Sequence, residues 1–469
     1  MGFSPGISSR PSASSEASTG LVAGVGLFGA TMVVMGGIVG SGIFINPYVV
    51  ASLVHTPSLI LGAWVAGGAI ALLGAFVYAE LADRMPVVGG QYAYLRDAFH
   101  PLVGFLYGWV CLFVINAASP AAVAVTFAKY FQNVVPVPVS DRWIAAGVLF
   151  LFAAINLLGV RAGSAVQSVF MVLRILAIAM VVAAGAYFLL RSPTATHPAW
   201  HPLLDRPVSF DLLTAFGATM VPVMFGYGGW QTANYVASEI REPRKYLPRA
   251  LLLGVAGIIA LYVSVNFIYV EALTPSGLAA TATPAFEVMR RAWGSAGGRL
   301  ISVAIAVSTL GFLSQVMLTY PRIYFAMAED GSFPRVFSRL GSRSHAPVFA
   351  VLLQSAATIA AVLLGTYEQI LSYVVVMDWL FFGLTASCVF VFRHREALAA
   401  GMNDSRSAGF RIPGHPWTTG IFTLAAWLIT LNTIYKYPRN AVAAVCILLA
   451  GVPIYFLARG RRPDSAASA

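Results

Sequence analysis

The sequence predicts an all-α integral membrane protein of about twelve transmembrane helices, in which the first and the sixth helix are broken. Three observations support this prediction. The composition is 58% hydrophobic and only 10% charged, whereas a soluble domain carries roughly 25% charged residues. Apolar stretches of about 20 residues, the length that crosses the hydrocarbon of a bilayer, recur along the whole chain. Glycine clusters interrupt two of these stretches near the middle.

The number of helices follows from the apolar stretches, because no linker divides the chain into soluble domains. The first stretch is too long for a signal-peptide core and lacks a small-residue cleavage site, so we expect it to stay attached. The expected helices cover residues 27–54, 58–82, 101–128, 143–160, 164–190, 212–240, 250–273, 299–328, 347–364, 368–392, 417–435 and 440–458.

The distribution of charge predicts the orientation of these helices. The net charge is +11, and if both termini are placed inside, Lys and Arg are about twice as frequent in the inner loops as in the outer ones. Such an excess marks the cytoplasmic side. We therefore expect a multi-pass protein of the cell membrane with cytoplasmic N- and C-termini, and no nucleic-acid partner. Residues 1–24 are expected to form a disordered cytoplasmic tail, and 461–469 a second cytoplasmic tail.

The two glycine clusters lie in corresponding helices. The first is Gly36-Gly37-Ile38-Val39-Gly40-Ser41-Gly42, and the sixth helix contains Phe225-Gly226-Tyr227-Gly228-Gly229-Trp230. Glycine costs roughly 1 kcal/mol in a helix interior, so such clusters favour interruption. The alternative is close helix packing through small residues, for which Gly36 and Gly40 have the right spacing.

Interruptions five helices apart predict an inverted repeat with a central site. Five is odd, so helices 6–10 enter the bilayer from the face opposite to helices 1–5. We expect the first half at 25–200, the second half at 208–396, and helices 11 and 12 at 412–460.

Unwound backbone inside a membrane survives only where it lines a cavity. Free N–H groups at Gly42 and Ile43 would carry the positive end of a helix dipole and suit a carboxylate. Free carbonyls at Val223, Met224 and Phe225 would suit an ammonium group. A site with both poles suits an α-amino acid.

These residues resemble the amino acid–polyamine–organocation superfamily and, within it, prokaryotic stand-alone members of the L-amino acid transporter family. The resemblance extends from about Leu27 to Phe456. It rests on GSGIFINP (40–47), MPVVGGQYAYLRDAF (85–99), NLLGVRAGSAVQ (156–167), FGYGGWQTANYVASEIREPRKYLPRA (225–250), YPRIYFAMAEDGSFP (320–334) and RIPGHP (411–416). It implies the LeuT-type fold, a 5+5 inverted repeat with helices 1 and 6 broken plus two peripheral helices.

The resemblance also implies site residues. Substrate would lie against the two breaks, with Phe225 as the aromatic gate that closes over it, and the phenol of Tyr262 would meet the unwound segment. The alternatives are core packing for Phe225 and Trp230 and a membrane-interface position for Tyr262. The implied substrate-binding residues are Gly40, Ser41, Gly42, Ile43, Phe225, Gly226, Gly228, Trp230 and Gln231.

The sequence departs from the family pattern at three places. The loop at 132–141 lacks the cysteine that links members to a glycoprotein heavy subunit, so no such partner is expected. Arg174 stands where members commonly carry lysine, and Asp378 where many carry asparagine.

Arg174 and Asp378 are also the two charges near mid-span. Placing each charge there costs at least ~2.5–3.5 kcal/mol, which favours a functional role. The alternative is a structural role in which each charge is neutralised by its surroundings, including by the other charge. By resemblance, Arg174 would occupy the space where sodium-coupled relatives bind a cation. Ser308 and Thr309, which match positions of cation ligands in those relatives, would then only pack.

The function implied is secondary transport of amino acids by alternating access, as a sodium-independent exchanger or facilitator. Neutral L-amino acids are the first choice, because no acidic residue adjoins either break in sequence and Gly228 and Gly229 would leave room for a bulky side chain. Cationic amino acids or polyamines are the alternative, and an amino acid sensor or channel is the alternative class.

An enzyme is not expected, because the seven histidines fall in loops or at helix ends and no HExxH motif occurs. The three cysteines lie in apolar stretches, so neither a disulfide framework, a metal site nor a cofactor is expected.

Overall fold

The computed structural model describes residues 25–85, 90–157, 164–191, 198, 200–235, 237, 240–341, 347–365, 367–400 and 409–459. The regular secondary structure of this part is helical, and its only β-structure is two isolated bridges. In chain order the elements are α1 (Leu27–Ile38), α2 (Gly42–Leu53), α3 (Pro57–Arg84), α4 (Gln91–Ala98), α5 (Pro101–Val110), the π-helical turn η1 (Cys111–Ile115), α6 (Asn116–Gln132), α7 (Asp141–Leu157), α8 (Ser164–Arg191), α9 (Phe210–Tyr227), α10 (Thr232–Tyr235), α11 (Pro243–Ala279), α12 (Pro284–Thr319), α13 (Pro321–Glu329), the 3-10 turn η3 (Arg335–Ser338), α14 (Val348–Leu364), α15 (Tyr367–Ala400), α16 (Trp417–Lys436) and α17 (Pro438–Arg459).

The helices account for all twelve predicted spans. Ten helical segments of the described chain are long and apolar enough to cross a membrane. The remaining two predicted spans, 143–160 and 347–364, correspond to α7 and α14, which have 17 residues each. Residues 158–160 of the former lie outside the described part. The prediction of a multi-pass, all-α membrane protein is therefore confirmed.

The boundaries differ from the prediction where polar residues continue a helix beyond the bilayer. α11 begins at Pro243 and α15 continues to Ala400, because a helix needs an apolar surface only across the hydrocarbon. α12 begins at Pro284, well before the predicted residue 299, and bends at Trp293 and Gly294, where Gly294 has φ +67°.

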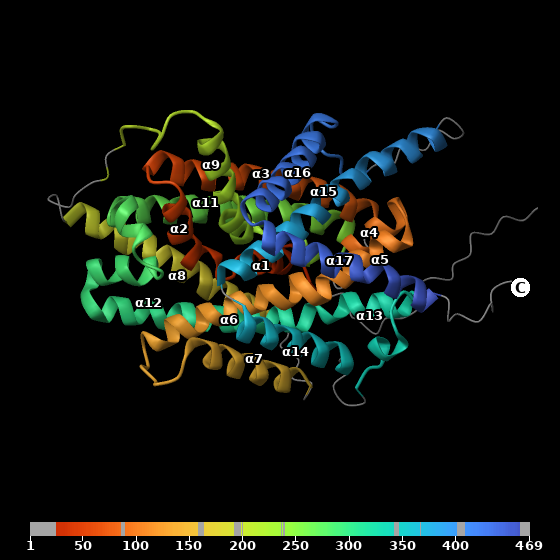
Figure 1. The fold of residues 1–469 in the computed structure, drawn as a ribbon, viewed down its shortest axis with the longest axis horizontal. Helices are drawn as coiled ribbons and strands as arrows, with labels where there is room; N and C mark the ends of the chain where they lie inside the picture. Colours follow the sequence, from red (N-terminus) through yellow and green to blue (C-terminus); the bar gives the residue numbers. More distant parts are fainter. Residues whose placement is uncertain are drawn as a thin grey trace, which may run out of the picture.

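The broken first helix runs through the interior of the bundle. α1 packs against α8 and α11, and α2 packs against α9 and α11. In Figure 1 these red segments lie between α9 and α11 above and α6 and α12 below. The breaks are thereby placed near the middle of the protein.

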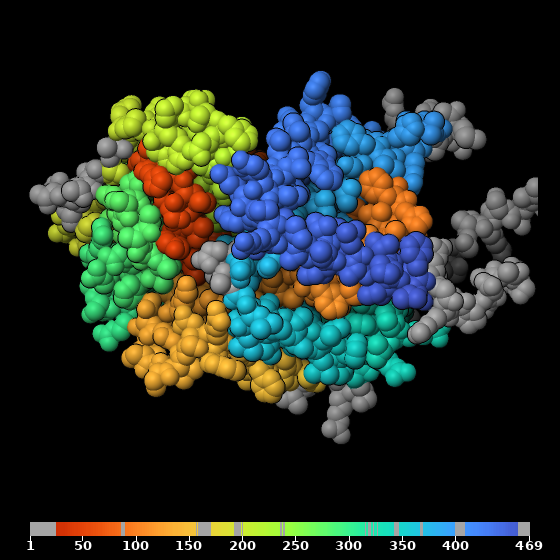
Figure 2. Space-filling model, viewed as in Figure 1, coloured from red at the N-terminus to blue at the C-terminus, as the bar shows by residue number. Residues whose placement is uncertain are grey.

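The last two helices lie outside this core. α16 packs on α15 and α9, and α17 packs on α5; Figure 2 shows them in blue over the face toward the viewer. Leu424, Leu428 and Leu431 on α16 are more than half exposed. This spacing forms one apolar stripe on a helix, which fits a helix that faces lipid.

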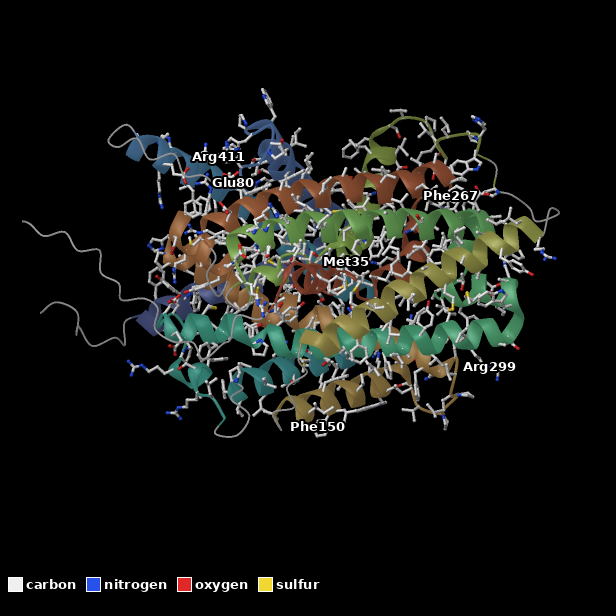
Figure 3. The ribbon with its side chains drawn as sticks, turned by 180° about the vertical axis from the view of Figure 1, so that it is seen from behind. Met35, Glu80, Phe150, Phe267, Arg299 and Arg411 are labelled. Atoms are coloured by element: carbon white, nitrogen blue, oxygen red, sulfur yellow. The ribbon has the colours of Figure 1, made fainter. Side chains whose placement is uncertain are left out.

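The two ends of the bundle carry the charged side chains. Figure 3 shows Glu80 and Arg411 toward one end and Arg299 toward the other, with Met35 in between.

Candidate functional site

The first break separates α1 from α2. α1 ends at Ile38, and Val39 leaves the helical conformation with φ −75° and ψ 84° before α2 begins at Gly42. The first N–H groups of a helix have no acceptor within that helix and carry the positive end of its dipole. The hydroxyl of Ser41 is buried and has no hydrogen-bond partner in the described part of the chain. This end of α2 therefore presents donors to an anion.

The second break separates α9 from α10. α9 ends at Tyr227, Gly229 has φ +105°, and α10 begins at Thr232. The carbonyl of Met224 accepts the N–H of Gly228 at 2.8 Å. The expectation of free carbonyls at Val223 and Met224 is therefore wrong, because the helix continues for two residues beyond Phe225. The open carbonyls are those of the last residues of α9, Phe225 to Tyr227.

The two breaks touch through their glycines. A side chain on Gly229 would overlap the Gly37 carbonyl, and a Cβ on Gly42 would lie 2.6 Å from the Cα of Gly226. Small residues do allow close backbone packing here, as the alternative interpretation expected. The glycines in close contact are Gly37 and Gly42, however, and not Gly36 and Gly40. The space at Gly229 is filled by backbone, so it leaves no room for a bulky substrate side chain.

One cavity of about 40 Å³ lies between the breaks. Most of the predicted residues line it, together with apolar side chains such as Val123, Phe312 and Val374 from three other helices. The predicted residues that line it are Gly40, Ser41, Gly42, Phe225, Gly228, Gln231 and Asp378.

Three predicted residues do not belong to the wall of this cavity. Trp230 is fully buried and stacks on Phe382 with ring centroids 5.1 Å apart, so packing is the better interpretation for it. Gly226 faces Gly42 and the ring of Trp64. Ile43 is fully buried in the first turn of α2, where only its backbone N–H could serve a ligand.

Arg174 joins the unwound end of α1 to α12. Its side chain is 1% exposed, and it donates hydrogen bonds to the carbonyls of Gly36 at 3.0 Å, Val39 at 3.2 Å and Ser308 at 3.1 Å. The guanidinium thus satisfies carbonyls that the break leaves open. Among the described residues no ion pair joins it to Asp378, and its hydrogen bonds go to carbonyls instead.

The three further candidates lie around this arginine. The hydroxyl of Tyr262 is fully buried and lies 3.4 Å from the Ile38 carbonyl, a long hydrogen bond. Tyr262 therefore meets the unwound segment and is not an interface residue. Thr309 donates to the carbonyls of Ile305 and Ala306 within its own helix. Ser308 and Thr309 are both buried.

Asp378 lies across the cavity on α15. The sequence analysis found no acidic residue next to either break. This is corrected here, because Asp378 lines the same cavity as Gly40 and Phe225. The described residues provide no hydrogen bond or ion pair to its carboxylate. A contact between residues so distant in sequence could not be read from spacing.

The sequence analysis missed three polar residues of the cavity, Asn116, Ser119 and Tyr320. The amide of Asn116 donates to the hydroxyl of Tyr324 at 3.0 Å. Asn116 directly follows η1, and single π-helical turns within helices frequently occur at functional sites. Polar residues three apart in the middle of an apolar span were the available signal.

Comparisons with known proteins agree with this geometry. The chain is 29% identical to the large neutral amino acids transporter small subunit 2 of Mus musculus, over 97% of this chain and 85% of that protein. It is 28% identical to the Asc-type amino acid transporter 1 of Homo sapiens, over 97% and 84% of the two chains. It is also 28% identical to the serine/threonine exchanger SteT of Bacillus subtilis, over 94% and 98%.

The family profile described as amino acid permease matches residues 25–458, which include both breaks, the cavity between them and all twelve helices. The chain therefore belongs to the amino acid permease family and is a membrane transporter.

Proposed function

We propose that this protein exchanges or facilitates the passage of neutral L-amino acids across the cell membrane by alternating access, without sodium. The observation that carries the proposal is the pair of breaks that face one cavity. The start of α2 offers backbone donors, and the end of α9 offers backbone acceptors. The names of the relatives, two neutral amino acid transporters and a serine/threonine exchanger, support this class of substrate.

In this proposal the substrate carboxylate binds at Gly42 and Ile43, where Ser41 adds a free hydroxyl. The substrate ammonium binds the carbonyls of Phe225 to Tyr227. Phe225 is partly exposed and lines the cavity, and its ring closes over the bound substrate. Only backbone and one hydroxyl take part, so every α-amino acid would be held in the same way.

Arg174 supplies the permanent charge that lets the protein work without sodium. A guanidinium is not expected to deprotonate in a protein, and here it binds carbonyls of α1 and α12 at once. Sodium would need the same carbonyl oxygens. Proton transfer at this residue is therefore not part of the proposed cycle.

The topology of the proposal follows the inverted repeat, with one half at 25–200, the other at 208–396 and both termini in the cytoplasm. The chain would work alone, since the loop between α6 and α7 has no cysteine for a heavy-chain partner. Reconstitution of the purified chain without any partner tests this point together with transport.

The test is counterflow in proteoliposomes that contain the purified protein. Vesicles loaded with an unlabelled neutral amino acid should accumulate external labelled amino acid transiently above its equilibrium level. A channel gives no counterflow and a sensor gives no uptake, so either result would overturn the proposal. Asp378 in the cavity favours cationic amino acids or polyamines as the second candidate substrates, and competition by L-lysine and putrescine tests them.

A further inference from the structure

The wall of the cavity includes polar side chains that backbone recognition of the substrate does not use. Asp378 reaches it from α15, Asn116 and Ser119 from α6, and Tyr320 from the residue between α12 and α13. Tyr320 lies within electrostatic range of Asp378, and Ser119 lies next to Tyr320. Four polar side chains from three parts of the fold thus belong to the wall of one cavity.

The carboxylate of Asp378 requires a donor that the described protein does not supply. A polar group without a partner inside a membrane protein is costly and marks a functional position. Arg174, the other ionisable group near mid-span, donates to three carbonyls and not to Asp378. The amide of Asn116 donates to Tyr324. Neither group therefore donates to Asp378, and a hydroxyl or ammonium group of the cavity's occupant can supply the donor.

On the proposed function, the substrate ammonium is engaged by the carbonyls at the end of α9. The part of the substrate that remains to donate to Asp378 is then its side chain. The cavity is about 40 Å³ and has to accept the whole substrate, so a short side chain is favoured over a long one. A hydroxyl one carbon from the α-carbon meets both requirements, whereas the long chain of lysine meets only one.

We propose that Asp378 determines specificity: it accepts a hydrogen bond from the side chain of the substrate and selects small hydroxyl-bearing amino acids. The inference rests on the proposed function and adds to it the class of side chain. Val123, Val374 and Val375 complete the wall with apolar surface, against which the methyl group of threonine packs.

The first test uses the parent protein in proteoliposomes and compares two isosteric pairs. L-Threonine and L-valine, and L-serine and L-alanine, compete for uptake of labelled L-serine. A site that hydrogen-bonds a hydroxyl rejects an analogue that lacks it, so the hydroxyl-bearing member should compete at least about tenfold better. Equal competition by valine and threonine would overturn the inference. Stronger competition by L-lysine than by threonine would overturn it as well, because the subsite would then accept a long cation.

The second test uses variants of Asp378. Asp378→Leu keeps the shape of the side chain and removes both acceptors, so the preference for threonine over valine should disappear. Asp378→Asn keeps one acceptor oxygen and should retain part of the preference. Asp141→Asn, at the start of α7 and away from the cavity, should leave the preference unchanged. An Asp378→Leu protein that still prefers threonine would contradict the role.

The proposed function and the role of Asp378 are tested separately by these experiments. If no amino acid shows counterflow, the proposed function is wrong. If amino acids are exchanged but the isosteric pairs compete equally, the proposed function stands and only the assignment of Asp378 is wrong. The parent panel decides this even if a variant does not insert into the membrane.

Discussion

Arg174 and Asp378 both lie near the middle of predicted membrane spans, but their contacts in the structure differ. Arg174 is buried against three carbonyls, while Asp378 faces the cavity without a partner in the described part of the chain. The cost of an intramembrane charge predicts that both matter. It does not say which one contacts the substrate, because that depends on the helix each one faces across the bundle.

The contacts of Arg174 lead to a prediction. Arg174→Lys should retain part of the transport rate because the charge remains, although the guanidinium fork is lost. Arg174→Ala should lower the rate at least about tenfold, since it leaves buried carbonyls without donors. The initial rate of exchange is the measurement, and Arg191→Ala at the exposed end of α8 is the matched control. Full activity in Arg174→Ala would contradict the role of the charge.

Phe225 carries a second prediction at this scale. Its ring lines the cavity at the end of α9, so Phe225→Ala should lower turnover far more than it lowers expression. Phe225→Trp should retain some activity because it keeps the bulk. Phe267→Ala, which truncates an exposed ring on α11, should behave as the parent does. If Phe225→Ala also transports at the parental rate, the ring is core packing and not a gate.

The site was predictable from sequence only where a residue's role comes from its own stretch of chain. The glycines at 40–42 and 228 indicate backbone breaks by themselves, and both positions line the cavity. Asn116 and Ser119 are visible in the sequence only as polar residues within an apolar span, and Tyr320 becomes a site residue only through tertiary contact. Trp230 does not line the cavity itself but stacks on Phe382, which does, and this too depends on tertiary contact.

At the scale of helices, the glycines at the breaks have two roles, close packing of helices and formation of the cavity wall. The sequence pattern alone does not distinguish these roles. Gly42 permits the close approach of α2 to α9, whereas Gly40 borders the cavity at ordinary contact distance from Phe312, 3.4 Å from a Cβ. A bulky substitution at Gly42 would therefore abolish transport through lost packing alone, so a pair of small substitutions is needed to separate packing from substrate binding.

That pair is Gly42→Ala and Gly40→Ala. Overpacking typically costs about 1–3 kcal/mol, so Gly42→Ala should lower the thermal stability of the purified protein. Gly40→Ala should leave stability unchanged and raise KM, because its methyl group enters the cavity. Thermal unfolding in detergent and uptake kinetics measure the two effects. A Gly42→Ala protein as stable as the parent would refute the close packing of the breaks.

An ion-pair network joins three elements at the end of the bundle opposite Arg299. Glu80 on α3 is fully buried and accepts hydrogen bonds from Arg84, from Arg393 on α15 and from the N–H of Ile412. Removing one partner of a buried pair leaves the other charges uncompensated. The network thus ties the extension of α15 and the loop before α16 to the core.

Replacing Glu80 should therefore destabilise the protein. Glu80→Gln is expected to cost about 3–5 kcal/mol, seen as a lower midpoint of thermal unfolding. Glu396→Gln removes a carboxylate from the same network that is 42% exposed and should cost no more than about 1 kcal/mol. Equal effects of the two substitutions would contradict the structural role of Glu80.

For the whole molecule, the sequence predicts the number of spans well and their ends less well. Hydropathy reports where lipid contacts the chain, which is the property that the bilayer imposes on all twelve helices. Hydropathy does not reveal the short helices α4, α10 and α13, which form near the breaks and at the ends of the spans. Ten of the twelve predicted spans are long and apolar enough to cross a membrane in the described chain, and the shorter helices α7 and α14 match the other two. The two breaks are confirmed, while the orientation of the termini stays a prediction.

The most direct test of the central claim is counterflow of an amino acid measured in sodium and in choline. Proteoliposomes loaded with unlabelled L-threonine receive labelled L-threonine outside, and the initial rate is recorded in each buffer. The account predicts a transient overshoot with equal rates in both, because the charge of Arg174 is permanent and already binds the carbonyls that a sodium ion would need. Absence of an overshoot, or uptake only in sodium, would contradict it.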